Sequence, residues 1–341
     1  MMKRAFDMPT LSIVVPMYNE EEAMAGFFDR VQSVLQTVTP SYEIICVNDG
    51  SRDLTLARLR QAAETDPRIK VVNLSRNFGK EIALSAGMDH AIGDAVIPID
   101  ADLQDPPEVI PLMMAKWRAG AKVVLAKRRD RSSDSWLKRL TANGAYWLFS
   151  KLTHPRIPQN VGDFRLMDRE VVNAIKRLPE RSRFMKGLFA WVGYEAETVE
   201  YDRESRSAGE TKWNYWKLWN FALDGITSFS SLPLRVWSYL GFGVSLLAMA
   251  YLAWTVAKTV IFGLDVPGYA SLMSVILFFN GISLIGIGVI GEYLGRIFTE
   301  VKGRPLYLVA ETIGIDATAR PQAPGAQPAP SDEPRARLTG Q

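Results

Sequence analysis

The sequence predicts an α/β domain with a doubly wound sheet, followed by a hairpin of two membrane-spanning helices. From Leu11 to about Ala126, short apolar runs rich in β-branched residues alternate with amphipathic stretches. This pattern is typical of strands buried on both faces of a parallel sheet with helices between them. Two long apolar stretches follow from Val236 onward, and each has the roughly 20 residues that a helix needs to cross a bilayer.

The α/β part contains five expected strands and four expected helices. The strands are Leu11–Val15, Tyr42–Val47, Ile69–Leu74, Ala95–Ile99 and Lys122–Ala126. The helices lie between them, near Glu21–Val38, Asp53–Glu64, Gly79–Ile92 and Pro107–Ala119. Ligands of such sheets bind beyond the carboxyl ends of the strands. The residues that follow each strand are therefore the candidates for a site.

The rest of the chain divides by composition. Between Ser135 and Trp213 we expect helices near Trp136–Leu152 and Asp168–Leu178 and a strand at Glu195–Tyr201. The expected division is a globular domain over 1–211, an amphipathic helix over 212–233, two spans within 234–298, a juxtamembrane segment over 299–316 and a tail over 317–341. The tail is rich in proline and alanine, which predicts disorder.

The two apolar stretches are expected to span at about 236–262 and 271–291. The first contains one charge, Lys258, and the second contains none. A pair of buried core helices is the alternative, which the length of the stretches disfavours. The glycines at 281, 286, 288 and 291 favour close packing of helices in lipid.

Flanking charges predict the orientation of the hairpin. Arg235 precedes the first span, and Arg296, Lys302 and Arg304 follow the second, whereas the connecting loop holds only Asp265. Basic residues favour the cytoplasmic side. We therefore expect both ends of the hairpin, the globular domain and both termini to be cytoplasmic, as in a multi-pass protein of the cell inner membrane.

A tryptophan-rich segment precedes the first span. Trp213, Trp216 and Trp219 recur about every three residues with lysines among them, which predicts an interfacial helix at headgroup level. A helix packed on the globular domain is the alternative.

Composition narrows the function. The chain has 341 residues, with 40 Lys+Arg against 37 Asp+Glu, and 48% of its residues are hydrophobic. These values exclude a wholly disordered chain. The balanced charge gives no support for a nucleic-acid partner. A single cysteine, Cys46, excludes an intrachain disulfide, and two histidines argue against a metal site built on Cys or His.

Polar clusters follow three of the strands. They are Pro16–Glu20, Asn48–Ser51 and Asp100–Asp105, and a fourth cluster comes later, at Gly162–Arg165. Alternating carboxylates such as Asp100 and Asp102 can share a hard divalent cation with the phosphates of a substrate. The pair alone is a weak signal, but its place after a strand strengthens it, as does Asp49 on a neighbouring strand. A turn is the alternative role for Asp49, because Asn-Asp-Gly-Ser favours turns.

The nucleotide-binding glycine motifs are missing from the sequence. Neither Gly-x-Gly-x-x-Gly after the first strand nor Gly-x-x-x-x-Gly-Lys-Ser/Thr occurs, which disfavours a dinucleotide-binding enzyme and a P-loop ATPase. Phosphates would instead be held by a metal and by basic side chains. The candidates are Lys127, Arg128, Arg129, Arg139, Arg203, Arg206 and Lys212. A solvated or membrane-facing surface is the alternative role for each.

Five motifs in order, together with the C-terminal hairpin, resemble the polyprenyl-phosphate glycosyltransferases of glycosyltransferase family 2. The motifs are Pro16–Glu20, Asn48–Ser51, Asp100–Glu108, Gly162–Arg165 and Arg206–Lys212. The family includes dolichol-phosphate mannose synthases, and the nearest resemblance is to bactoprenol glucosyltransferases. The aminoarabinose transferases that modify lipid A share much of the ending Gly291–Arg296.

The resemblance implies a GT-A fold, an inverting mechanism and a set of site residues. The nucleotide-sugar site it implies is Pro16, Tyr18, Glu20, Asp49, Ser51, Asp100, Ala101 and Asp102. The implied ligands of Mg²⁺ or Mn²⁺ are Asp100, Asp102 and Gln104, and the implied phosphate contacts are Arg128, Arg139, Arg206 and Lys212. The implied catalytic residues are Asp163, Asp102 and Arg206. Asp163 matches a proposed base, but an acceptor phosphate with a pKa near 6 needs none, so Asp163 can instead orient Arg165 or the acceptor.

The expected activity is transfer of a hexose from a nucleotide sugar, with UDP-glucose favoured, to undecaprenyl phosphate at the cytoplasmic membrane face, for cell-surface glycan modification such as that of O-antigen. Transfer from GDP-mannose, transfer of aminoarabinose and a non-catalytic membrane scaffold are the alternatives. A processive polysaccharide synthase is disfavoured because Gln-x-x-Arg-Trp does not occur. A transporter is disfavoured because the two spans contain no acidic residue. The glycine-rich spans are also compatible with a homo-oligomer.

Overall fold

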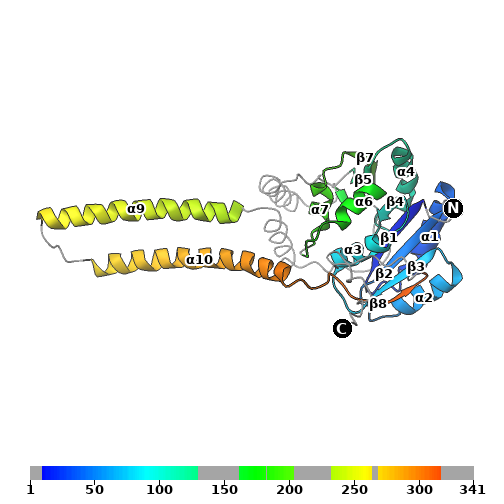
Figure 1. Cartoon of the computed structure of the whole chain (residues 1–341), viewed down its shortest axis with the longest axis horizontal. Coiled ribbons are helices and arrows are strands. Elements are labelled where there is room, and N and C mark those ends of the chain that lie inside the picture. The colour runs from blue at the N-terminus through cyan, green and yellow to red at the C-terminus, as the bar shows by residue number, and fades with distance from the viewer. Residues whose placement is uncertain (1–9, 130–160, 182, 203–231, 263–267, 316–341) are drawn as a thin grey trace, which may run out of the picture.

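The computed structural model describes residues 10–129, 161–181, 183–202, 232–262 and 268–315. An α/β domain contains the sheet, and two long helices extend from one side of it (Figure 1). The strands are β1 (Leu11–Met17), β2 (Tyr42–Asn48), β3 (Ile69–Leu74), β4 (Ala95–Pro98), β5 (Val123–Arg128), β6 (Val161–Asp168), β7 (Ala196–Tyr201) and β8 (Val309–Ile313). The helices of the domain are α1 (Met24–Val38), α2 (Thr55–Thr65), α3 (Lys80–His90), the 3₁₀ turn η1 (Pro107–Val109), α4 (Ile110–Arg118), α6 (Arg169–Lys176) and α7 (Met185–Trp191).

The sheet is mixed, in the order β7-β5-β6-β4-β1-β2-β3-β8. β1 pairs in parallel with β2 and β4, and β2 pairs in parallel with β3. β6 is antiparallel to both β4 and β5, so β5 runs in the same direction as β4. The five strands expected from the sequence therefore all run the same way, and β6 and β8 are the two strands of opposite direction.

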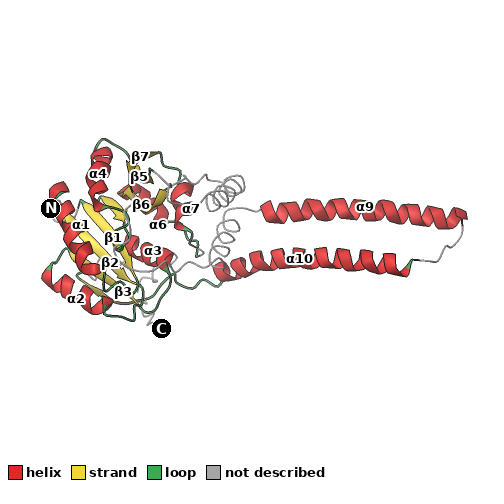
Figure 2. Cartoon of the chain, turned by 180° about the vertical axis from the view of Figure 1, so that it is seen from behind, coloured by secondary structure: helices red, strands yellow, loops and turns green. Residues whose placement is uncertain are grey.

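Helices cover both faces of the sheet, as a doubly wound fold requires (Figure 2). On one face, α1, α2 and α4 bury residues such as Phe27, Leu59 and Met113 against the strands. On the other face, α3, α6 and α7 bury residues such as Leu84 and Val172. The central strands β1 and β2 are buried almost continuously, which explains why their sequences are apolar runs rather than alternating patterns.

Two strands were not expected. β6 contains the polar residues Gly162, Asp163 and Arg165, so it did not stand out as an apolar run. β8 lies in the segment 299–316 that was expected to be juxtamembrane, and it pairs antiparallel with β3 at the edge of the sheet. The backbone N–H of Ser75 also donates to the carbonyl of Leu308 over 2.9 Å. The chain thus returns from the second long helix to the domain.

The two long helices are α9 (Leu232–Phe262) and α10 (Tyr269–Val301). By length and composition, the stretches Val236–Phe262 and Phe278–Val301 qualify as membrane spans. In an apolar segment of 18 residues within each stretch, only 0% and 6% of the residues are buried within the protein. This exposure removes the alternative of two buried core helices. The second stretch lies further along the chain than the expected 271–291, and the two ranges share Phe278–Gly291.

A close contact between α9 and α10 occurs at one of the glycines expected to favour packing. A Cβ added at Gly286 would collide with the indole of Trp237, so this position needs glycine. At 281, 288 and 291 an added Cβ would meet nothing within 4 Å. The glycine pattern therefore explains one contact between the two helices.

The end of α10 is attached to the α/β domain. The backbone N–H of Arg181 donates to the carboxylate of Glu300 over 2.8 Å, and its guanidinium Nε donates to the carbonyl of Arg304 over 2.6 Å. Tyr307 donates its hydroxyl to Asp89 over 2.9 Å. These contacts and β8 fix the end of the hairpin to the domain, on the side where α3 and α7 lie (Figure 1).

Three expectations fall outside the described residues. They are the helix near 136–152, nearly all of the amphipathic helix over 212–233, and the tail over 317–341.

Candidate active site

Polar residues gather at the edge where β1, β2 and β4 end. β6 adds to this edge although it only begins there, because it runs antiparallel and its residue Val161 pairs with Lys127 near the end of β5. β7 ends at the same edge, with Tyr201 beside Arg128. The antiparallel direction of β6 therefore brings the Gly162–Arg165 motif to the carboxyl ends of the parallel strands.

The loops after β1 and β2 are tied to each other. The backbone N–H of Asn19 donates to Ser51 Oγ over 3.0 Å, and the Asn19 side-chain oxygen accepts from the backbone N–H of Arg52 over 2.9 Å. The backbone N–H of Glu20 donates to Thr55 Oγ1 over 2.9 Å. Asn19 has a positive φ of 54°, which asparagine tolerates better than most residues. The two motifs thus form a single surface.

Asp49 anchors the start of α3. Its two carboxylate oxygens accept from the backbone N–H groups of Phe78, over 2.7 Å, and Gly79, over 2.9 Å. Burial raises the pKa of this carboxyl, and the hydrogen bonds from Phe78 and Gly79 oppose the rise. β1 separates β2 from β4, so Asp49 does not lie on the strand next to Asp100. The position of Asp49 in a nucleoside site stays a prediction.

Gly50, in the turn after β2, has a φ of +66°, and an added Cβ would lie 2.5 Å from the backbone of Arg76 and Asn77. The turn role considered for Asn-Asp-Gly-Ser is therefore present at this position. We expect Gly50→Ala to destabilise the domain by about 2 kcal/mol or more, since it adds a strained φ to a backbone collision. Thermal unfolding followed by tryptophan fluorescence checks this, and a midpoint equal to that of the wild type would contradict it.

The acidic pair lies after β4. Gln104 donates its backbone N–H to Asp102 Oδ1 over 3.2 Å, and Leu103 between them has a positive φ of 56°. The Gln104 side chain is buried, and its Oε1 has no hydrogen-bond partner in the described part of the chain. A buried amide oxygen without a donor is suited to a cation. The side chains of Asp100, Asp102 and Gln104 thus each offer an oxygen atom as a possible metal ligand.

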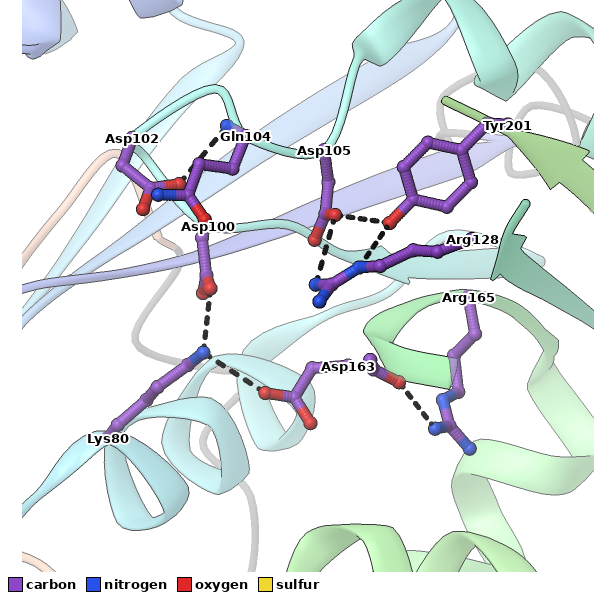
Figure 3. A network of polar contacts seen from close by, with 10 residues as sticks. Lys80, Asp100, Asp102, Gln104, Asp105, Arg128, Asp163, Arg165 and Tyr201 are labelled. Atoms are coloured by element: carbon purple, nitrogen blue, oxygen red, sulfur yellow. Dashed lines mark hydrogen bonds and ion pairs between the residues drawn. The ribbon is translucent and has the colours of Figure 1, made fainter. Parts of the chain in front are cut away.

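Lys80 joins Asp100 to Asp163 (Figure 3). Its Nζ lies 2.7 Å from Asp100 Oδ2 and 3.0 Å from Asp163 Oδ2. Burial alone would lower the pKa of the Lys80 ammonium, but the two carboxylates raise it above its ordinary value. Lys80 is the first residue of α3, so the contacts of Asp49 with Phe78 and Gly79 also hold the backbone of Lys80. Lys80 was not among the site residues expected from the sequence.

Asp163 is a largely buried carboxylate, and one of its oxygens lacks a hydrogen-bond partner among the described residues. Burial opposes its ionisation, but the charges of Lys80, Lys186 and Arg165 outweigh burial and lower its pKa. Its Oδ1 is buried and has no hydrogen-bond partner among the described residues. Asp163 is therefore ionised at neutral pH, with an acceptor oxygen left for a ligand or for a residue outside the described ranges.

Arg165 is held by the backbone next to Asp163. It donates from Nη2 to the carbonyl of Gly162 over 2.8 Å, and its guanidinium lies 4.1 Å from the ring centre of Phe189. Burial lowers the pKa of Arg165 to about 10, so it stays charged at neutral pH. Gly162 rather than Asp163 thus makes the direct hydrogen bond to Arg165, while the charge of Asp163 favours its ionisation.

Glu81 is the next residue on α3 and accepts from the backbone N–H of Met185 over 3.1 Å. Burial, followed by the charge of Asp163, raises its pKa to about 7. Glu81→Gln tests this value. The Glu81 carboxyl loses its proton near pH 4.3 in the unfolded chain and near pH 7 in the folded chain. Ionisation of Glu81 therefore lowers wild-type stability as pH rises through this window.

The glutamine variant keeps an acceptor for Met185 but cannot ionise. We expect its advantage in stability over the wild type to grow between pH 4.5 and 7, to about 1–3 kcal/mol, and to level off above pH 7. Thermal unfolding in detergent across this pH range measures the difference. Parallel curves for the two proteins would contradict the raised pKa.

Of the four phosphate contacts that the family resemblance implies, Arg128 is the one that lies within the described residues. Its Nε donates to Tyr201 Oη over 3.1 Å, and Tyr201 donates in turn to Asp105 Oδ1 (Figure 3). An added Cβ at Gly162 would lie 3.3 Å from Arg128 Nη2, so the glycine leaves room for the guanidinium. Arg128 is therefore held in place yet remains 28% exposed, as a residue that contacts a ligand must be.

The residues after β4 decide whether this site can hold a divalent cation. No group of three His, Cys, Asp or Glu residues that could hold a metal occurs within the described ranges. Mg²⁺ in phosphate-transferring sites is commonly held by one or two carboxylates together with the phosphates of the substrate. Asp100, Asp102 and the unpartnered amide oxygen of Gln104 suit that arrangement, so the residues present fit the ion.

The structure brings together most of the expected site. Pro16, Tyr18, Glu20, Asp49, Ser51, Asp100, Ala101, Asp102, Gln104, Arg128 and Asp163 belong to the loops and strand ends at this edge. Arg139, Arg206 and Lys212 lie outside the described residues. Lys80, Glu81, Asp105 and Tyr201 were not expected. Asp105 belongs to the Asp100–Glu108 motif. For Lys80, the sequence signal was its place at the start of an expected helix.

The comparisons with known proteins show the family of the chain. Residues 12–176 match the model of glycosyl transferase family 2, and residues 232–297 match the GtrB C-terminal hairpin. The chain is also 54% identical over 302 residues to the SfII prophage-derived bactoprenol glucosyl transferase of Shigella flexneri, a match that covers 89% of this chain and 98% of the relative. The chain belongs to glycosyltransferase family 2. Its GT-A-like fold and its identity as a glycosyltransferase agree with the expectations from the sequence.

A second relative matches this glycosyltransferase over a similar length. It is 61% identical over 306 residues to an uncharacterized glycosyltransferase of Synechocystis sp., covering 90% of this chain and 96% of the relative. Among solved structures, glucosyl-3-phosphoglycerate synthase from Mycobacterium tuberculosis, in complex with Mn²⁺, UDP-glucose and phosphoglyceric acid, has a TM-score of 0.45 and 19% identity, covering 64% of this chain and 78% of that one.

Proposed function

We propose that this glycosyltransferase transfers glucose from UDP-glucose to a polyprenyl phosphate, with inversion, at the cytoplasmic face of the inner membrane. The similarity to bactoprenol glucosyl transferases, 54% identity over 98% of the relative, is the observation that carries the proposal. The two apolar helices, which match the GtrB hairpin, support association with a membrane.

The donor nucleotide is assigned to the surface formed by the loops after β1 and β2. Pro16, Tyr18, Glu20, Asp49 and Ser51 belong to it, and the hydrogen bonds of Asn19 with Ser51 and Arg52 keep the two loops together. Tyr18 is 39% exposed, so its ring is available to a base. The buried carboxylate of Asp49 already accepts two backbone hydrogen bonds, which supports a positioning role within this surface.

The donor diphosphate is assigned to the region between the acidic pair and Arg128. Asp100, Asp102 and Gln104 would hold Mg²⁺ or Mn²⁺, which when bound neutralises charge that develops on the leaving diphosphate. Arg128 would add a fixed positive charge, because Tyr201 and Asp105 orient its guanidinium. Arg139, Arg206 and Lys212 complete the proposed phosphate contacts. Stabilisation of the leaving group is commonly the largest contribution to such a reaction.

The acceptor is assigned to the side of Asp163. A polyprenyl phosphate keeps its tail in the bilayer, so its phosphate must reach a site held near the membrane surface. The attachment of Arg181 to Glu300 and Arg304 fixes the domain to the end of α10 and supports this placement. Basic residues at the outer ends of the hairpin favour a cytoplasmic catalytic domain.

A donor screen tests the proposed function. Purified full-length protein is incubated with undecaprenyl phosphate and, separately, UDP-glucose, other UDP-sugars and GDP-mannose, each with Mg²⁺, with Mn²⁺ or with a chelator. We expect lipid-linked product from UDP-glucose that depends on the metal. Product from GDP-mannose alone, or metal-dependent transfer of another sugar in preference to glucose, would contradict the donor assignment.

A further inference from the structure

The position of Lys80 has a consequence for metal binding. Its ammonium lies 2.7 Å from the Asp100 oxygen and 3.0 Å from the Asp163 oxygen, so a positive charge already sits between the first carboxylate of the acidic pair and the carboxylate on β6. Asp100 is 36% exposed at its side chain and Asp163 is 16% exposed. The more accessible partner of Lys80 is therefore the carboxylate assigned to the metal.

We propose that Lys80 is an internal counter-ion that holds Asp100 and Asp163 together before the donor binds and that must release Asp100 when a divalent cation binds there. The inference rests on the proposed function, because it takes Asp100 and Asp102 as ligands of the metal. Lys80 is a positioning residue in this scheme, since it acts through the two carboxylates.

Two features of the fold support this exchange. First, the backbone of Lys80 is fixed, because Asp49 binds the N–H groups of Phe78 and Gly79 at the start of α3. Second, the side chain of lysine is long and flexible, so the ammonium can leave Asp100 while the backbone stays in place. After release, Asp163 remains within reach as its partner, and the pair of carboxylates is never left without a cation.

The carboxylate of Asp163 gives the released ammonium a partner. Lys80, Lys186 and Arg165 all act on Asp163, but Lys80 alone among them forms an ion pair with Asp100 in the described part of the chain. Binding of the metal therefore exchanges one ion pair for another at Asp100 only. Binding of the metal must break the Lys80–Asp100 ion pair, which costs free energy. Lys80 therefore weakens metal binding in the absence of the donor.

Binding of Mn²⁺ to the full-length protein in detergent, measured by the loss of the free-ion paramagnetic resonance signal, tests the proposal. Without UDP, we expect Lys80→Met to bind Mn²⁺ at least about fivefold more tightly than the wild type, within the range typical of coupled binding events. Lys80→Arg keeps the charge and should bind as the wild type does. Lys80→Gln serves as a second neutral variant should the methionine variant misfold.

Lys186→Met is the matched control. It removes a charge that acts on Asp163 without an ion pair to Asp100, so we expect a smaller change in Mn²⁺ affinity. Neutral Lys80 variants that bind Mn²⁺ with wild-type affinity, or that change no more than Lys186→Met, would overturn the counter-ion role. A wild type that binds no Mn²⁺ even with UDP, together with neutral Lys80 variants that also fail, would instead remove the metal site of the proposed function.

Discussion

Asp102→Ala is expected to abolish metal-dependent sugar transfer while the protein still inserts into membranes. Asp102 stands on the loop after β4, where Gln104 donates its backbone N–H to it, and it is one of the two carboxylates assigned to the metal. Loss of a metal that neutralises the leaving group removes several kcal/mol of stabilisation, so we expect turnover to fall by roughly 1,000-fold. Initial rates of lipid-linked product formation, at several Mg²⁺ concentrations, measure this.

The control for Asp102→Ala removes a carboxylate elsewhere. Glu197 lies on β7 and forms an exposed ion pair with Lys116, so Glu197→Ala should leave transfer unchanged. Membrane fractionation shows whether each variant is inserted. Transfer by Asp102→Ala that proceeds equally with and without metal, at a rate near that of the wild type, would refute the assignment of Asp102.

Asp163→Asn is the second change with a large expected effect. It keeps the shape of the side chain but removes the charge that pairs with Lys80. We expect turnover to fall by about 100-fold, with donor binding little changed, since effects of this size are typical of groups that act in the transition state. Asp94→Asn, which changes an exposed carboxylate remote from Lys80, is the matched control and should retain normal turnover.

The pH profile of Asp163→Asn separates a base from an orienting group. The lowered pKa of Asp163 makes it a weak proton acceptor at neutral pH, and a phosphate monoester with a second pKa near 6 is already largely deprotonated. We therefore expect the variant to keep the acid limb of the wild type near pH 6, at a lower plateau. Rates that recover between pH 7 and 9 would indicate that Asp163 removes a proton, and near-normal rates at all pH values would rule out both roles.

The sequence predicted the parallel strands and the position of the acidic motif after one of them. The five apolar runs are strands within one or two residues at most ends, because burial on both faces leaves a continuous apolar signature. Asp100 and Asp102 were recognised because they follow such a run, and the carboxyl ends of parallel strands are where ligands bind. The long apolar stretches of α9 and α10 predicted the hairpin from length alone.

The remaining features depend on contacts that no local pattern encodes. β6 and β8 are set by pairing with distant strands, and β8 lies after the second long helix. Lys80 and Asp163 are 83 positions apart in sequence, and only the antiparallel direction of β6 brings them together. The expected place of Asp49 on a strand next to that of Asp100 was wrong because β1 lies between β2 and β4. The partners of its carboxylate are backbone N–H groups of the loop before α3, which no local pattern indicates.

Structural characterisation of the lipid product is the most direct test of the proposed reaction. The protein is incubated with UDP-glucose, undecaprenyl phosphate and Mg²⁺, and the purified product is examined by mass spectrometry and nuclear magnetic resonance. We expect one glucose joined through a single phosphate to the lipid, in the β configuration, with UDP released in equal amount. A pyrophosphate-linked sugar with release of UMP, an α-linked product, or release of free glucose without lipid-linked sugar would contradict inverting transfer to a polyprenyl phosphate.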